Sequence, residues 1–327
     1  MKNILFTIIL LSLSLTIYSQ TFEDYMTSAT QAADLWNYEE AIVSYDKALE
    51  LQPENKDIYF LRGYAKDMAG DRKSAVKDYS KALEFYPDDS SIYYSRAYAR
   101  EYIYDYQGAA EDCSKYLELA AADPAIYSLS AGCKYQLKDY SGAVEDYTQA
   151  IILDPEFSET YYQRAYAYIE TKDFDKAIED YKMVLELDPS NSRIPGKIAT
   201  VKVKAGDFSG AIADSNSLIT ENPDNLEAYF IRGFAKTESG DYEGAIKDIY
   251  YVINLYQGLQ EAFYYRAVSR FHLNKVEKAL MDLDKAIEIE PEYAEAYYQR
   301  AIVKDSLHDK DGSISDYKKA EELGYIK

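Results

Sequence analysis

Six arginines recur in this sequence at one position of a 34-residue register, and an aspartate follows each of them sixteen residues later. A guanidinium and a carboxylate can join through two parallel charge-assisted hydrogen bonds. Catalysis would require one such pair in an environment of its own, and a pattern repeated six times provides none. We interpret the pairs as braces between helices, within one repeat or between neighbours. The arginines are Arg62, Arg96, Arg164, Arg232, Arg266 and Arg300, and the full aspartate series is Asp78, Asp112, Asp146, Asp180, Asp214, Asp248, Asp282 and Asp316.

Histidine and cysteine, the common metal ligands and nucleophiles, are scarce. His272 and His308 are the only histidines; a metal site that includes Asp305 is conceivable, but two exposed histidines are the preferred interpretation. We interpret Cys113 and Cys133 as two small buried apolar residues; the alternative is a disulfide, which requires Cα atoms within about 7 Å. The sequence has no phosphate-binding glycine loop and no Ser-His-Asp or Cys-His arrangement. It therefore predicts no enzyme, no cofactor and no metal.

Small residues form two further series with the same period, without one insertion or deletion. Where two helix axes approach to about 8 Å, a side chain larger than alanine does not fit between them. Two small positions per period thus predict two touching helices, and a fixed period of this length is typical of a stacked helical repeat. The series are Ala29, Gly63, Ala97, Ala131, Ala165, Ala199, Gly233, Ala267 and Ala301, and Ala41, Ala75, Ala109, Ala143, Ala177, Ala211, Ala245, Ala279 and Ser313.

Each period holds two stretches with helical apolar periodicity and a short break between them, as in residues 57–69 and 73–85. Gly70 suits the left-handed residue that ends a helix, and Asp71 suits the N-cap of the next helix. Prolines then end the second helix or open the following one. Roughly eighteen short antiparallel helices are expected. The cap aspartate recurs as Asp105, Asp139, Asp173, Asp207, Asp241 and Asp309, and the proline recurs as Pro53, Pro155, Pro189, Pro223 and Pro291.

Three stretches carry a resemblance to a known family: residues 59–65 (YFLRGYA), 147–155 (YTQAIILDP) and 240–246 (GDYEGAI). They resemble the signature stretches of tetratricopeptide repeats, and the resemblance covers residues 22–327. It implies an all-α fold, a right-handed α-solenoid of nine 34-residue helix-turn-helix repeats that forms one continuous body. The expected repeats are 22–55, 56–89, 90–123, 124–157, 158–191, 192–225, 226–259, 260–293 and 294–327.

The resemblance also implies that the first helix of each repeat lines a concave groove. The groove-facing positions hold many aromatic rings, which give a large contact area at small entropic cost. The alternative is that tyrosine, with 36 copies, is simply frequent in this sequence and that the rings fold back onto neighbouring helices. Four other tyrosines, Tyr59, Tyr79, Tyr147 and Tyr181, are better explained as core. The expected groove aromatics are Phe60, Tyr64, Tyr94, Tyr98, Tyr102, Tyr135, Tyr162, Tyr166, Phe230, Phe234, Tyr264, Tyr265, Phe271 and Tyr298.

Acidic residues share the groove with these rings. Six lie in the first turn of a helix, where the helix dipole favours them, and need no functional explanation. Six others lie in the last turn, where the dipole opposes them by a few tenths of a kcal/mol, which indicates a partner with Lys or Arg. The first-turn acids are Glu23, Asp57, Glu159, Glu227, Glu261 and Glu295, and the last-turn acids are Asp34, Asp67, Glu101, Glu170, Glu238 and Asp305.

The sixth repeat differs from the others. It holds all three bases of the groove, Arg193, Lys197 and Lys204, and its first helix contains Pro195-Gly196. Glycine in a helix costs about 1 kcal/mol relative to alanine. This repeat is therefore expected to be a softer joint or a local site for a carboxylate of a partner.

Charge and the N-terminus restrict the setting. A formal net charge of −21 argues against nucleic acid and against anionic membrane surfaces. Lys2, the apolar run of residues 4–17 and Ser19-Gln20 have the anatomy of a signal peptide, residues 1–20, although an uncleaved anchor is the alternative. The mature protein is expected to be exported, periplasmic or secreted, with no stable membrane insertion. Its leader and tyrosine-rich repeats resemble exported bacterial repeat proteins.

The sequence thus predicts a non-enzymatic scaffold that binds a protein or peptide segment, preferably one with basic residues, in an acidic and aromatic groove. The alternatives are a structural or assembly component of the cell envelope that acts through its convex face or ends, and a glycan-binding module. The predicted binding residues are Phe60, Tyr64, Tyr94, Tyr98, Glu101, Tyr102, Tyr162, Tyr166, Glu170, Phe230, Phe234, Glu238 and Tyr264.

Overall fold

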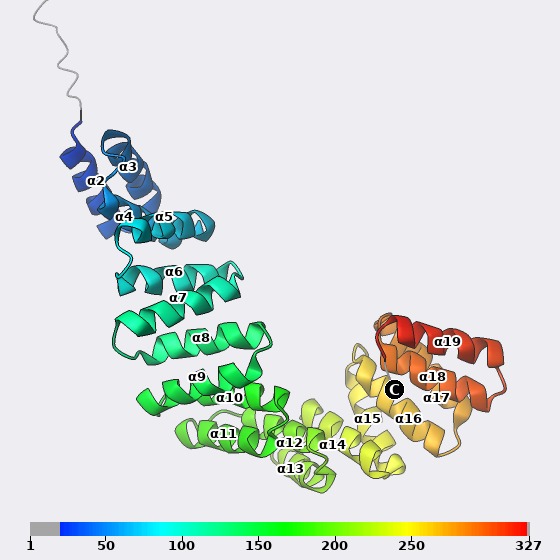
Figure 1. Ribbon diagram of the computed structural model, residues 1–327. Helices are drawn as coiled ribbons and strands as arrows, with labels where there is room; N and C mark the ends of the chain where they lie inside the picture. The colour runs from blue at the N-terminus through cyan, green and yellow to red at the C-terminus, as the bar shows by residue number, and fades with distance from the viewer. Residues whose placement is uncertain (1–19, 326–327) are drawn as a thin grey trace, which may run out of the picture. The chain divides into compact units, whose positions relative to one another are not determined.

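The computed structural model describes residues 20–325, which form eighteen α-helices and no β-strand. This confirms the all-α prediction and the expected number of helices. The predicted signal peptide lies outside the described residues, apart from Gln20. The helices, shown in chain order in Figure 1, are α2 (Phe22–Asp34), α3 (Tyr38–Leu51), α4 (Lys56–Met68), α5 (Arg72–Phe85), α6 (Ser90–Tyr102), α7 (Tyr106–Leu119), α8 (Pro124–Gln136), α9 (Tyr140–Leu153), α10 (Ser158–Glu170), α11 (Phe174–Leu187), α12 (Ile194–Lys204), α13 (Phe208–Glu221), α14 (Leu226–Ser239), α15 (Tyr242–Leu255), α16 (Gln260–His272), α17 (Val276–Ile289), α18 (Ala294–Ser306) and α19 (Lys310–Glu322).

The chain divides into two compact units, one that ends at Asp154 and one that begins at Pro155. Helices α2 to α9 belong to the first unit and α10 to α19 to the second. Within each unit, the two helices of a repeat pack against each other, and the second of them packs against the first helix of the next repeat. The 34-residue register continues unbroken through the boundary, and the expectation of one continuous body stays a prediction.

The small residues of both series lie where the two helices of a repeat cross. Every alanine in the two series is fully buried. A Cβ atom added to Gly63 would lie 3.0 Å from the ring of Tyr79, and one added to Gly233 would lie 2.6 Å from Cγ1 of Ile249. Because packed interiors yield little to extra volume, these distances confirm the predicted limit on side-chain size.

Aspartates cap the second helices, as their spacing predicts. Asp71 accepts a hydrogen bond from the backbone N–H of Ser74 at 3.2 Å, and five of the other six predicted caps make the equivalent bond. At the remaining cap, Asp173 instead pairs with Lys176 at 2.6 Å. Gly70, just before the first of these caps, has a φ of 89°, which confirms its predicted left-handed conformation.

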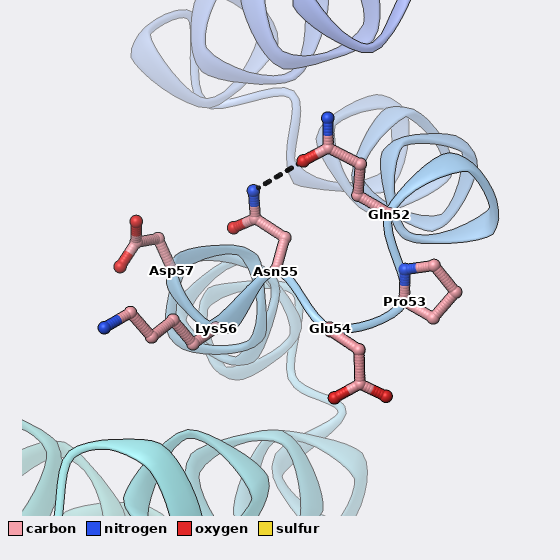
Figure 2. Close-up of a pocket in the computed structure, with 6 residues that line it drawn as sticks. All are labelled: Gln52, Pro53, Glu54, Asn55, Lys56 and Asp57. Atoms are coloured by element: carbon pink, nitrogen blue, oxygen red, sulfur yellow. Dashed lines mark hydrogen bonds between the residues drawn. The ribbon is translucent and has the colours of Figure 1, made fainter.

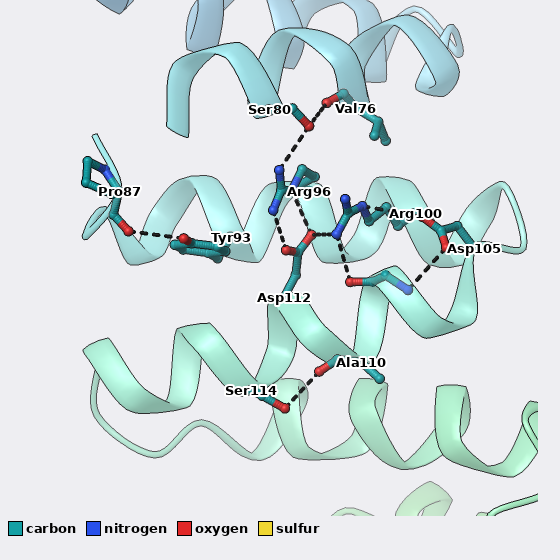
Figure 3. A network of polar contacts seen from close by, with 11 residues as sticks. Val76, Ser80, Pro87, Tyr93, Arg96, Arg100, Asp105, Ala110, Asp112 and Ser114 are labelled. Atoms are coloured by element: carbon teal, nitrogen blue, oxygen red, sulfur yellow. Dashed lines mark hydrogen bonds and ion pairs between the residues drawn. The ribbon is translucent and has the colours of Figure 1, made fainter. Parts of the chain in front are cut away.

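The Arg–Asp pairs lie within single repeats, which decides between the two arrangements that the sequence allows. Arg96 donates from Nε and Nη2 to the two carboxylate oxygens of Asp112 at 2.8 and 2.6 Å. Its Nη1 also donates to the hydroxyl of Ser80 on α5 at 2.9 Å, as Figure 3 shows. One arginine on α6 therefore ties together α5, α6 and α7. The same bidentate pair occurs in all six repeats that have the arginine.

A second cation joins most of these pairs, from the register position four residues after the arginine. Arg100, four residues after Arg96, places Nη1 2.9 Å from Asp112 (Figure 3). The attraction of two cations offsets more of the desolvation cost of a buried carboxylate than the attraction of one. The equivalent residues in four other repeats are Lys66, Lys236, Arg270 and Lys304.

The fifth repeat lacks this second cation because Tyr168 takes its place. Among the described residues, Asp180 pairs with Arg164 alone, and burial outweighs that pairing and raises the pKa of Asp180. Burial also acts on Asp316 in the ninth repeat, but hydrogen bonds from Arg300 and Lys304 outweigh it and lower the pKa of Asp316. The pKa shifts of Asp180 and Asp316 therefore have opposite directions, and Asp316 is the one with two cations.

We expect Gly233→Ala to lower the free energy of unfolding by about 1–3 kcal/mol because the new methyl group collides with Ile249. Gly132→Ala is the matched control, since the nearest atom to its added Cβ would be the Tyr147 hydroxyl at 3.8 Å. There the helix propensity of alanine should stabilise the protein by up to about 1 kcal/mol. Urea unfolding followed by circular dichroism measures both; equal destabilisation by the two variants would contradict the packing constraint.

We expect Tyr168→Lys to lower the pKa of Asp180, as the paired lysine does at Asp316. The raised pKa means that the folded state binds a proton more tightly than the unfolded state, so ionisation of Asp180 costs stability above the pKa of an unfolded aspartate. The new cation should recover roughly 1 kcal/mol at neutral pH and nothing at acid pH, where the carboxyl is protonated. Carbon-13 NMR titration of Asp180 measures the shift, and Tyr168→Leu should leave the pKa raised.

Candidate functional site

The first helices of successive repeats are neighbours within each unit. Contacts link α4 with α6 and α6 with α8 in the first unit, and they link α12, α14, α16 and α18 in series in the second. All of the residues that the sequence predicts for binding lie on first helices. Phe60, Tyr64, Tyr94, Tyr98, Glu101 and Tyr102 lie on α4 and α6, whereas Tyr162, Tyr166, Glu170, Phe230, Phe234, Glu238 and Tyr264 lie on α10, α14 and α16.

Three predicted tyrosines of the first unit are open to solvent. Tyr64, Tyr98 and Tyr102 are 46%, 37% and 60% exposed. The ring of Tyr102 lies 3.5 Å from the guanidinium carbon of Arg72, which is itself paired with Asp67 at 3.3 Å. Asp67, one of the six last-turn acids, therefore has a cation within the protein and needs none from a partner.

Other predicted rings of the first unit fold back onto the second helices. Phe60 packs on Tyr79 and Tyr94 packs on Tyr116, with ring centroids 5.8 and 5.7 Å apart. Both alternatives that the sequence leaves open thus occur in one unit: Phe60 and Tyr94 extend the core, whereas Tyr98 packs on Tyr94 with ring centroids 4.9 Å apart and stays partly exposed.

In the second unit, Tyr162 and Tyr166 form a pair on α10. Their hydroxyl oxygens are 3.0 Å apart, and both rings lie against the buried ring of Tyr181, with centroids 5.8 and 6.4 Å away. The ammonium of Lys197, a predicted groove base from the sixth repeat, lies 6.0 Å from the centroid of Tyr166. This pair therefore already faces a cation from its own unit.

Aromatic side chains from α14 and α16 form a continuous group, which we call the α14–α16 ring cluster: Phe230, Phe234, Tyr264 and Tyr265. Phe234 stacks on Tyr265 at 4.3 Å, and Phe230 meets the same ring edge-on at 6.1 Å. Tyr264 contacts Tyr265 at 5.2 Å and Tyr293, just before α18, at 5.4 Å. The rings are partly buried, so they present an apolar floor with limited exposure.

Carboxylates surround this ring cluster without a cation. Burial raises the pKa of the Tyr265 hydroxyl, and the nearby Tyr264, Glu238, Glu261 and Glu295 raise it further. Burial alone raises the pKa of Glu238. Oε2 of Glu261 is buried, and no described residue donates a hydrogen bond to it. None of the three glutamates has an ion pair within the described residues.

Glu261 is the residue of this site that the sequence does not reveal. Its place in the first turn of α16 is explained by the helix dipole alone, and the burial of its oxygen depends on packing between helices. Of the last-turn acids, Asp305 accepts a hydrogen bond from the Tyr317 hydroxyl at 3.0 Å. Glu238 has no ion pair within the described residues, and it is the last-turn acid that lies beside the α14–α16 ring cluster.

The cysteines and histidines take structural places. Cys113 and Cys133 are free and fully buried, as predicted, and burial raises the pKa of the Cys133 thiol to about 12. His272 stacks on Tyr242, with ring centroids 4.4 Å apart. His308 has a φ of 61° in the turn before α19. Within residues 20–325, no three His, Cys, Asp or Glu side chains gather as metal ligands.

The turn between the helices of a repeat carries exposed rings that the sequence does not single out. Trp36 and Tyr104 precede the N-caps of α3 and α7 with φ of 63° and 65°, and they are 74% and 76% exposed. A left-handed conformation is uncommon for a bulky residue. Their fixed place in the 34-residue register is the signal that could have drawn attention to them.

A hollow of about 500 Å³ lies at the connection between α3 and α4 (Figure 2). Six consecutive residues, 52–57, line it, and Asn55 donates to the side-chain oxygen of Gln52 at 3.0 Å. A similar hollow recurs in the next repeat at residues 85–90. The hollow therefore belongs to the geometry of the inter-repeat loop and brings no distant residues together.

Family models match along most of the solenoid. Models described as tetratricopeptide repeat match residues 57–89, 158–191, 197–254 and 261–293, and one described as TPR repeat matches residues 37–67 and 134–172. The chain is a tetratricopeptide repeat protein. Its repeats are those of a protein-interaction scaffold, a class that is generally non-catalytic.

Solved structures agree with this fold. Naa15/Naa10 bound to HypK-THB matches with a TM-score of 0.51 and 12% identity over 93% of this chain and 64% of that chain. A tetratricopeptide repeat protein from Parabacteroides merdae matches with a TM-score of 0.46 and 18% identity over 90% of this chain and 98% of that chain. YrrB, described as a TPR protein with an unusual peptide-binding site, matches with a TM-score of 0.43 and 26% identity over 59% and 99%. No curated protein matches the chain.

Proposed function

We propose that this tetratricopeptide repeat protein binds a segment of a protein partner on the first-helix face of its second unit, at the α14–α16 ring cluster. The segment would place apolar side chains on Phe230 and Phe234. A lysine or arginine beside them would pair with Glu238 or Glu261. The exposed Tyr64, Tyr98 and Tyr102, with Glu101, form the corresponding face of the first unit.

The unpaired carboxylates carry this proposal. The aspartates of the Arg–Asp braces lie at least as deep, and each has one or two cations within 3 Å. Glu261 has a buried carboxylate oxygen, and Glu238, exposed at the end of α14, has a raised pKa; neither has a cation, which a partner would supply. Their position beside aromatic rings favours a cation carried on an apolar segment over a free inorganic ion.

Basic peptides test the proposal directly. We expect 15-residue amidated peptides with leucine and lysine to bind the full chain, and peptides with glutamine in place of lysine to bind at least fivefold more weakly. Glu238→Gln and Phe234→Ala should each weaken the lysine peptides several-fold, since a charge-assisted contact contributes about 1 kcal/mol or more. Isothermal titration calorimetry at two salt concentrations measures this, and affinity should fall as salt rises.

Glu277→Gln is the matched control, because Glu277 is exposed on the second helix α17 and the change in net charge is the same. Equal binding of lysine and glutamine peptides would contradict the proposal. Binding that survives Glu238→Gln and disappears with Trp36→Ala and Tyr104→Ala would support the alternative, assembly through the turns and ends.

We also propose that the protein is exported, to the periplasm or beyond the cell, after removal of residues 1–20. The basic and apolar pattern of this segment supports the proposal. No helix within residues 20–325 is long and apolar enough to cross a membrane. Mass spectrometry of the protein from fractionated cells should find a mature N-terminus near Gln20 outside the cytoplasm; an intact Met1 in the cytoplasmic fraction would contradict export.

A further inference from the structure

In six repeats, an arginine side chain fills the same position between the two helices. In each, the arginine guanidinium sits on the paired aspartate and also against an aromatic ring three residues earlier on the same helix. The distance from the guanidinium carbon to the ring centroid is 5.7 Å for Arg62 on Tyr59 and 5.1 Å for Arg232 on Tyr229. The other four pairs, Arg96 with Tyr93, Arg164 with Tyr161, Arg266 with Phe263 and Arg300 with Tyr297, fall between 5.3 and 5.7 Å.

The sixth repeat retains the aspartate and the second cation of this arrangement but lacks the arginine and the aromatic ring. Ile198 stands where the arginine should be, and Pro195 stands where the ring should be. Asp214 and the second cation Lys202 remain, with Lys202 Nζ 2.6 Å from Asp214 Oδ2. Among the described residues, Lys202 is the one cation paired with Asp214.

A cavity of about 280 Å³ lies at this place. Pro195, Ile198, Lys202 and Asp214 all line it, together with residues of α11 and α13. The side chain of Asp214 is 31% exposed, whereas the aspartates that hold an arginine are at most 7% exposed. The cavity is therefore the vacated position of an arginine and its ring, and it leaves the Asp214 side chain partly exposed, although Oδ2 beside Lys202 is itself buried.

The fourth repeat shows how the absence of the arginine can be compensated. Ser130 takes its place there and donates to Asp146 at 2.6 Å, while Lys134 pairs with the same carboxylate at 2.6 Å. The aromatic Tyr127 is retained. Ile198 has no hydrogen-bond donor, so the sixth repeat has no comparable substitute.

We propose that this repeat-six cavity binds a guanidinium or amidinium group carried next to an aromatic or apolar group. The planar cation would take the place of the missing guanidinium on Asp214, and the aromatic or apolar group would pack against Pro195 and Ile198. The same chain supplies the template for this geometry six times. The ligand is either a small amidine or guanidine, or an arginine with a nearby aromatic residue in a peptide, and both share this chemistry.

Lys182 on α11 also lines the cavity and must be compatible with a cation. For the arginines of repeats two and nine, the equivalent residue in the preceding repeat is Asp46 or Asp284, which accepts a hydrogen bond from the arginine. For Arg266 of repeat eight it is Tyr250, yet Arg266 still makes its bidentate pair with Asp282. That outer contact is thus dispensable, and the exposed Lys182 can turn toward solvent.

Titration of the full chain with two probes tests the inference. The probes are benzamidine and an acetylated, amidated Tyr-Ala-Ala-Arg peptide, and benzoate is the anionic counterpart of the first. NMR of backbone amides in α12 and α13 should show saturable shifts with at least one cationic probe and none with benzoate. Saturation by benzamidine alone would point to a small ligand, and a tighter fit of the peptide would point to a protein segment.

Ile198→Arg should fill the cavity from within and weaken both cationic probes at least tenfold. Asp214→Asn should weaken them similarly without altering the volume, which keeps the test valid if the arginine variant folds poorly. Lys182→Asp should tighten binding, and Glu243→Gln, exposed on α15, should leave it unchanged. Binding of benzoate in place of benzamidine, no saturable shifts, or equal binding to the Ile198→Arg variant would overturn the proposal. The α14–α16 ring cluster and its glutamates share none of these residues, so failure here leaves the proposed function untouched.

Discussion

The close approach of two helices in each repeat is the constraint on which the rest of the structure depends. Alanine or glycine at the crossing positions, with serine only at Ser313, brings the backbones together, and no repeat inserts or deletes a residue. Every position of the register therefore meets nearly the same surroundings from repeat to repeat. For this reason a single Arg–Asp arrangement recurs six times with hydrogen bonds of 2.6–3.0 Å.

Such regularity makes each departure informative. Tyr168 in place of a lysine leaves Asp180 with one cation and a raised pKa. Ile198 in place of an arginine opens a cavity beside Asp214. Each aspartate of the six braces has at least one cation, so Glu238 and Glu261, which lie beside aromatic rings without one, stand out by the same comparison.

Much of the fold follows from the sequence because its causes are local. The predicted stretch 57–69 is observed as Lys56–Met68, and Asp71 and Gly70 make the cap and the left-handed turn that their chemistry favours. Core tyrosines such as Tyr79 and Tyr181 are fully buried as predicted. The site is less predictable, since the fate of a ring depends on its neighbours across helices. Tyr94 and Tyr98 occupy the same helix face four residues apart, yet one packs on Tyr116 and the other is open to solvent. The second cation of most braces, by contrast, recurs at one position of the register, four residues after the arginine, and its spacing could have identified it.

Hydrogen–deuterium exchange of the full chain, with and without a saturating leucine–lysine peptide, tests the central claim most directly. If the unpaired carboxylates and rings bind a basic segment, slowed exchange should concentrate in α14 and α16, and Glu238→Gln should remove most of it. Protection confined to the second helices α15 and α17, or unchanged by that substitution, would show that the partner binds elsewhere and that these carboxylates do not recognise it.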